Sequence, residues 1–156
     1  VVDQLVDGFM FVGSCYPSRV SSQLMDEIVS VTEKIVAIIK PQGPGGLDFV
    51  CVNNKPYLID PNLGRLTAVH PIWHFRERYA PGKQFSSCSI SLPLSIYDFW
   101  EKLKKVGIAF DFKFSRKGVF PLYWFAHGSS KLMVFGNTYD EIQVMLEKLR
   151  SIEICL

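Results

Sequence analysis

Asp48, Asp60 and Asn62 are the side chains whose types and spacing suit the binding of a hard metal ion. They lie within the segment GGLDFVCVNNKPYLIDPNLGR. Mg²⁺ accepts carboxylate and amide oxygens; it typically takes one or two carboxylates and completes its shell with water and substrate phosphates. Asn62 follows Asp60 by two positions, so both face the same side of an extended strand. The prediction depends on the elements that carry these residues.

A strand–turn–strand is expected to position the three side chains. Residues 47–52 and 56–60 are β-prone runs, and the Asn-rich residues 53–55 between them tolerate the positive φ of a tight turn. If these three residues form the loop, Asp48 falls directly opposite Asp60, on the same face. A two-residue loop instead sends the two aspartates to opposite faces. Acidic residues at strand ends are also common where no metal binds.

The surrounding motifs widen this pattern. Residues 43–46 form a Gly-rich turn, Asp48 lies on the first strand, the Asp60-Pro61-Asn62 triplet ends the second, and Arg65 follows. In this order and spacing the motifs resemble the C-terminal half of an ATP-grasp ligase domain. The resemblance covers roughly residues 5–75, about half of the chain.

The resemblance implies a carboxylate–amine or carboxylate–thiol ligase with ATP as co-substrate. ATP phosphorylates a carboxylate in such enzymes, and a nucleophile then displaces phosphate from the acyl phosphate. The resemblance implies that Asp48, Asp60 and Asn62 hold Mg²⁺ or Mn²⁺, and that Asp60 and Asn62 also serve nucleotide binding. Arg65 is then the catalytic residue, whose planar fork holds the acyl phosphate or a developing oxyanion. A simple surface ion pair is the other interpretation of Arg65.

Two positions depart from the family pattern. Position 60 carries Asp where the family more often has Glu, which shortens the ligand by one methylene. Gly46 stands where D-alanine–D-alanine ligases place an Arg. A complete ATP-grasp domain also needs an N-terminal part with phosphate-binding lysines. We therefore expect this chain, which starts at Val1, to be the C-terminal piece of a longer enzyme and to be inactive by itself.

Composition is typical of a globular protein. The 156 residues are 48% hydrophobic and 13% aromatic, enough for one ordinary domain or two small ones with a sizeable core. The net charge of +2 comes from 17 basic and 15 acidic residues that are well mixed, so no nucleic-acid partner is expected. The sequence has neither a membrane-spanning apolar run nor a signal-peptide pattern. A cytoplasmic protein without a membrane partner is expected.

Cysteine and histidine residues predict no further chemistry. Cys51 and Cys88 fall in predicted strands and are expected to be buried thiols, as in a reducing compartment. Cys15 lacks a nearby activating partner, so it is not predicted to be a nucleophile. His70 and His74 lie four residues apart but have no third ligand nearby, which favours packing or surface roles over a metal site.

Residues 1–80 are assigned to the C-terminal portion of an ATP-grasp domain. Residues 5–16 predict a strand with Gly interruptions, and the segment from His70 through Arg78 predicts a short helix. A longer helix is predicted over residues 21–40, where Ser21 or Ser22 serves as the cap. Its inward residues recur at spacings of three and four: Leu24, Ile28, Val31, Ile35 and Ile38.

Residues 81–156 are assigned to a second, small α+β domain that begins at a Pro-Gly turn. Capping boxes at Ser95 and Thr138 each open a helix. The resulting β-α-β-β-β-α order predicts an antiparallel sheet with helices on one face, so the fold class of the whole chain is α+β. The predicted strands cover residues 87–92, 108–114, 119–126 and 131–135.

Three classes of function remain open. The chain is part of an ATP-dependent amide-bond ligase, with ATP and a small carboxylate or amine as its partners. Alternatively, it is a non-catalytic ligand-binding or regulatory module, because its C-terminal part is similar to small ligand-binding domains. Thirdly, it is a structural domain that retains the scaffold. Repulsion between paired carboxylates, costly without a cation, weighs against this third class.

Overall fold

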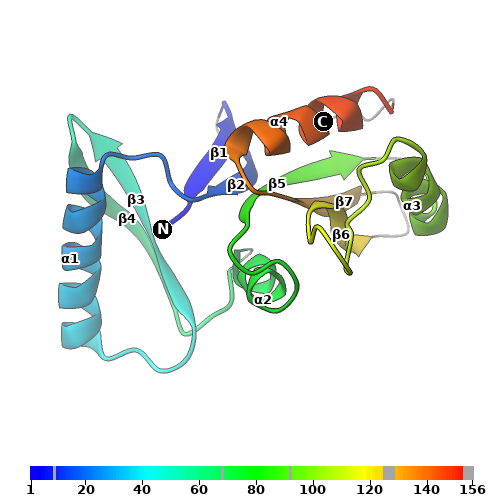
Figure 1. Cartoon of the computed structure of the whole chain (residues 1–156). Helices are drawn as coiled ribbons and strands as arrows, with labels where there is room; N and C mark the ends of the chain where they lie inside the picture. Colours follow the sequence, from blue (N-terminus) through cyan, green and yellow to red (C-terminus); the bar gives the residue numbers. More distant parts are fainter. Residues whose placement is uncertain (9, 68, 92, 125–128, 153–156) are drawn as a thin grey trace. The chain divides into compact units, whose positions relative to one another are not determined.

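The computed structural model describes residues 1–8, 10–67, 69–91, 93–124 and 129–152. Within them there are seven strands and four helices, and the strands form two antiparallel sheets, which confirms the predicted α+β class. Figure 1 shows these elements coloured along the chain. No described helix is long and apolar enough to cross a membrane. In chain order the elements are β1 Asp3–Asp7, β2 Met10–Tyr16, α1 Ser22–Ile39, β3 Gly45–Val52, β4 Lys55–Leu63, α2 Val69–Tyr79, β5 Gln84–Ser91, α3 Ile96–Lys105, β6 Gly118–Trp124, β7 Ser129–Gly136 and α4 Tyr139–Arg150.

The described residues divide into two compact units. The first holds residue 1 and residues 19–70, and the second takes its residues from 2–18 and 71–156. These units differ from the predicted segments 1–80 and 81–156, because β2 pairs with β5 and thereby places the N-terminal hairpin in the second unit. The division into units does not test the assignment of residues 1–80 to an ATP-grasp domain, which stays a prediction.

The first unit consists of α1 and the β3–β4 hairpin. The predicted helix is confirmed: Ser21 caps it by accepting the backbone N–H of Leu24 at 3.3 Å, and its buried residues are Leu24 and Ile28. Lys40 ends it in the left-handed conformation. Ile38 was expected to face inward but is 82% exposed, because it lies in the last turn, more than two turns beyond the buried pair.

The second unit is built on a five-stranded antiparallel sheet with the order β1-β2-β5-β7-β6. Leu132 and Val134 point from β7 into a core formed with α3 and α4, so the prediction that these two helices share one face is confirmed. Met133 and Phe135 alternate with them and face the other side. There Phe135 stacks on Phe75 of α2 at 5.4 Å between ring centroids. Figure 1 shows α4 and α2 on opposite faces of this sheet.

The predicted single strand over residues 5–16 is in fact most of a hairpin. β1 pairs antiparallel with β2, beginning with Asp3 opposite Cys15. Gly8, between the two strands, has a φ of +58°. Glycine adopts this left-handed conformation without steric cost, so the Gly interruption marks the turn between two strands.

The predicted strand over residues 108–114 is wrong, because the carboxylate of Asp111 folds the chain into a turn. Its two oxygens accept three backbone N–H groups at 2.8 to 3.2 Å, and these donors are unavailable to a strand. Only Ala109 forms an isolated bridge, with Val119. The three donors belong to Lys113, Phe114 and Ser115.

The Asp111 turn predicts a pH-dependent contribution to stability. The three backbone hydrogen bonds hold the pKa of the Asp111 carboxyl well below its usual range. Because the folded-state pKa is the lower one, this contribution is complete above the unfolded-state pKa of about 4 and is lost as the pH falls through the folded-state pKa. Asp111→Asn should therefore destabilise the chain at neutral pH, and its deficit relative to the wild type should shrink in acid.

Urea unfolding at about pH 7, 5 and 3 measures this difference directly. Asp26→Asn is the matched control, because Asp26 is an exposed residue of α1 and its substitution tests the loss of charge alone. A deficit for Asp111→Asn that stays constant from neutral to acid pH would contradict the role given to the carboxylate.

The described cysteines are free thiols in three environments. Cys15 is buried, Cys88 is partly buried and Cys51 is exposed, so the prediction of a buried Cys51 is wrong. Cys51 lies near the tip of the β3–β4 hairpin, where both adjacent residues are also exposed. Burial raises the pKa of the Cys88 thiol to about 11, which keeps it protonated at neutral pH. Cys155 lies outside the described residues.

Candidate metal and phosphate site

The loop between β3 and β4 has two residues rather than the three predicted. Asn53 and Asn54 have φ angles of 50° and 59°, and Val52 pairs with Lys55. Two consecutive left-handed residues are typical of a type I′ turn, a conformation that Asn tolerates. With this loop alone, a regular ladder would place Asp48 and Asp60 on opposite faces.

A β-bulge corrects the register before the ladder reaches the aspartates. Phe49 pairs with Leu58, but Asp48 pairs with Asp60, so Ile59 is the extra residue on β4. The insertion of one residue exchanges the two faces of the strand beyond it. The predicted pairing of Asp48 with Asp60 is therefore confirmed, although the mechanism is a bulge and not a longer loop.

Asn62 joins the two carboxylates. Its Nδ2 donates to Oδ2 of Asp60 at 3.0 Å and lies 3.4 Å from Oδ2 of Asp48. The Asn62 residue is only 7% exposed, whereas Asp60 is exposed and Asp48 is half-buried. The three side chains thus converge as predicted, and the shared amide offsets part of the repulsion between the two negative charges.

Arg65 completes the group from the other side of the amide. Gly64 follows the end of β4 with a φ of +74°, a turn conformation that suits glycine, and the next residue folds back toward the strand. The Arg65 guanidinium donates to Oδ1 of Asn62. The predicted catalytic residue and the three predicted ligands therefore form one connected network, while their roles stay predictions.

The donor set of this network fits a divalent cation with oxygen ligands. Among the described residues, no group of three or more His, Cys, Asp and Glu side chains is placed to hold a metal. Mg²⁺ needs fewer protein ligands, because water and substrate phosphates complete its octahedral shell. The carboxylates of Asp48 and Asp60 are ligands of this kind, whereas the Asn62 amide oxygen is turned toward Arg65 in this structure.

His70 has a structural contact that the sequence did not reveal. Its Nδ1 lies 2.9 Å from both the backbone N and the Oγ1 of Thr67, three residues earlier. The imidazole therefore accepts the Thr67 N–H, next to the start of α2. His74 is exposed on the same helix. These positions agree with the structural and surface roles predicted for the two histidines.

Lys131 is a charged residue that the sequence reasoning passed over. It lies in β7, is only 2% exposed, and its Nζ is 4.5 Å from the centroid of the Phe11 ring. Burial lowers the pKa of its ammonium group. The sequence signal that could have indicated a buried lysine is its position directly before the apolar run Leu132–Phe135. The Phe11 ring gives this cation a stabilising cation–π contact.

Comparison with known proteins gives a likeness in structure only. No protein-family model matches the chain, and no curated protein matches its sequence. The solved ADP complex of purK, N5-carboxyaminoimidazole ribonucleotide synthetase, has the same fold over 97% of this chain, with a TM-score of 0.67 and 11% sequence identity. The chain therefore shares the fold of a part of that synthetase, which is an ATP-grasp enzyme.

The structural likeness to the synthetase extends over 97% of the chain, which is more than the half marked by the sequence motifs. The chain spans 43% of the length of the synthetase, so it corresponds to a part of that enzyme. At 11% sequence identity, the likeness is evidence for a shared fold and gives no evidence for a shared activity.

Proposed function

We propose that this chain is part of an ATP-dependent carboxylate–amine ligase that forms an amide or peptide bond through an acyl phosphate. The observation that supports this proposal best is the pairing of Asp48 with Asp60, joined by Asn62, within an ATP-grasp fold. The bound cation is Mg²⁺ or Mn²⁺, held by these three residues. ATP and a small carboxylate or amine are the proposed ligands, and the rest of the ligase domain is a further part of the same protein.

The proposed reaction has two steps. A carboxylate oxygen of the substrate attacks the γ-phosphorus of ATP, and ADP leaves. The amine then attacks the acyl carbon, phosphate leaves, and the nitrogen loses a proton. A divalent cation supplies neutralisation of the phosphate charge when bound. Asp48 and Asp60 would hold this cation, and Arg65 holds the transferred phosphoryl group or the oxyanion through its planar fork.

The Asn62 amide links cation binding to Arg65 in this proposal. Asn62 now turns its N–H₂ toward the carboxylates and its oxygen toward Arg65. If the Asn62 amide rotates so that its oxygen binds a cation beside the carboxylates, its N–H₂ group faces Arg65 instead. Both groups are then donors, so the hydrogen bond between Asn62 and Arg65 cannot form. Arg65 then loses its protein acceptor and becomes available to a negatively charged substrate group.

A non-catalytic module on an ATP-grasp scaffold is the second candidate, and the same hydrogen bonds favour it. Asn62 donates toward both carboxylates, so the two charges are partly compensated by the protein alone. The repulsion between Asp48 and Asp60 is thus a weaker argument for a cation than their spacing in the sequence suggested.

Titration of Mn²⁺ into the 156-residue chain, followed by NMR, separates the two candidates. Paramagnetic Mn²⁺ should broaden the backbone amide signals of Asp48, Asp60 and Asn62 at lower concentration than any other signals. Asp60→Asn should abolish this selective broadening, whereas Asp26→Asn, which removes an exposed carboxylate of α1, should leave it unchanged. Broadening that is spread over all exposed carboxylates, or that survives Asp60→Asn, would favour the non-catalytic module.

The isolated chain is expected to fold without turning over ATP. ATP-grasp ligases use lysines from an N-terminal part to hold the nucleotide phosphates, and we propose that the complete protein supplies them. We also propose a cytoplasmic location, because the described cysteines are free thiols, as is usual in a reducing compartment.

A further inference from the structure

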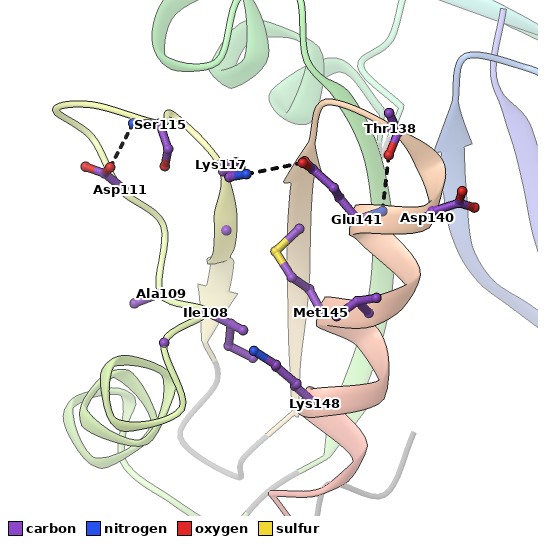
Figure 2. Close-up of a pocket in the computed structure, with 13 residues that line it drawn as sticks. Ile108, Ala109, Asp111, Ser115, Lys117, Thr138, Asp140, Glu141, Met145 and Lys148 are labelled. Carbon is purple, nitrogen blue, oxygen red and sulfur yellow. Dashed lines mark hydrogen bonds and ion pairs between the residues drawn. The ribbon is translucent and has the colours of Figure 1, made fainter.

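The second unit contains a pocket of about 500 Å³ between α4 and residues 107–118. Figure 2 shows its lining side chains. Its volume lies within the range of sites that bind small molecules. Its lining includes the apolar residues Ile108, Ala109, Val144 and Met145. It also includes four charged residues, Asp111, Lys117, Glu141 and Lys148.

Three of the four charged groups are already engaged by the protein. The Asp111 carboxylate accepts three backbone N–H groups of its own turn. The Glu141 carboxylate accepts from Lys117 Nζ at 3.2 Å and from the backbone N–H of Asn137 at 2.8 Å. These hydrogen bonds hold the pKa of both carboxyl groups below the usual range. Their negative charges are therefore compensated by the protein.

Lys148 is the exception. Figure 2 shows its side chain reaching from α4 toward Ile108, with Met145 one turn before it on the same side of the helix. Lys148 is exposed, and its ammonium group has no hydrogen bond or ion pair with any residue in the described ranges. Asp140, the remaining acid of the lining, projects from the other side of α4 in Figure 2. The pocket thus combines an apolar wall with one uncommitted positive charge.

We propose that this pocket binds a small amphipathic carboxylate. The acid group pairs with the Lys148 ammonium, and the apolar body lies against Ile108, Val144 and Met145. An ammonium ligand of the same shape is disfavoured, because the carboxylates of Asp111 and Glu141 are already hydrogen-bonded, Asp140 projects from the other side of α4, and Lys148 repels a cation. The pocket lies wholly in the second unit, so this proposal is independent of the Asp48–Asp60 site.

Three probes that share one apolar body test the charge preference: 4-phenylbutyrate, 4-phenylbutanol and 4-phenylbutylamine. Each is titrated into the full 156-residue chain and followed by ¹H–¹⁵N NMR. We expect 4-phenylbutyrate to shift the amide signals of Gly107, Gly118 and Lys148 with saturation, at a Kd on the order of 1 mM. The alcohol should bind more weakly, and the amine should bind weakest.

Two lysine substitutions test the residue itself. Lys148→Met keeps the apolar stem but removes the charge, so it should weaken binding of 4-phenylbutyrate by about tenfold and leave the alcohol unchanged. Lys102→Met, at an exposed lysine of α3 outside the pocket, is the matched control and should change neither. Val144→Asp, at a 51% exposed wall position, should abolish binding of the acid.

Three results would overturn the proposal. The first is the lack of saturable shifts at the pocket with 4-phenylbutyrate. The second is equal binding of the acid and the amine. The third is an equal effect of Lys148→Met and Lys102→Met on the acid, which would mean that the net charge of the chain and not the pocket attracts the ligand.

Discussion

Asp60→Ala is expected to lower kcat by about 10²-fold or more in the complete protein, measured as ADP release at saturating Mg²⁺ and ATP. The substitution removes a carboxylate that we propose as a direct ligand of the cation. It also leaves Asp48 with only one neighbour in the network, the Asn62 amide. Without this ligand the phosphate charge is less well neutralised, which raises the free energy of the transition state of phosphoryl transfer. The effect should therefore appear in kcat.

The controls for Asp60→Ala separate catalysis from folding. Asp26→Ala removes an exposed carboxylate of α1 and should keep wild-type turnover. Asp60 accepts a hydrogen bond from the buried Asn62 amide at 3.0 Å, so relief of repulsion with Asp48 is not expected to stabilise the variant. Arg65→Ala should reduce kcat by a similar factor. Wild-type turnover by Asp60→Ala would show that the proposed cation site is wrong.

Phe135→Ala is expected to destabilise the second unit by about 3–5 kcal/mol. Phe135 is fully buried, and its ring lies 5.4 Å from that of Phe75, 5.7 Å from that of Phe110 and 6.1 Å from that of Phe85, measured between centroids. Removal of its side chain leaves a cavity that rigid rings from α2, β5 and the Asp111 turn cannot fill.

Tryptophan fluorescence during urea unfolding measures this loss in the correct unit. All three tryptophans, Trp73, Trp100 and Trp124, belong to the second unit, so their signal follows its unfolding. Phe114→Ala is the matched control, because Phe114 is 87% exposed and should cost no more than about 0.5 kcal/mol. Similar losses for the two variants would contradict the aromatic core described for this unit.

The helices were the elements that the sequence predicted most accurately. Helical periodicity and capping boxes depend on residues a few positions apart, and α1, α3 and α4 begin after Ser21, Ser95 and Thr138 as expected. A helix closes its own backbone hydrogen bonds, so local sequence carries most of the information. The failed strand at residues 108–114 shows the limit, since one carboxylate, Asp111, captured the backbone donors.

Strand partners depended on tertiary structure. The pairing of β2 with β5 joins residues about seventy positions apart, and no local pattern indicates it. It is the pairing that moved the unit boundaries away from the predicted division at residue 80. The pocket beside α4 has the same origin, because its two walls come from separate elements.

The candidate site shows both contributions in one hairpin. The sequence by itself determined which donors are present, in which order, and that Asp48, Asp60 and Asn62 lie on adjoining strands. It left open whether they share a face, because a change of one residue in the loop reverses the answer. The tertiary structure decided that question with the bulge at Ile59, which compensates for a two-residue loop. A bulge depends on the packing and twist of the paired strands, which single-strand patterns do not encode.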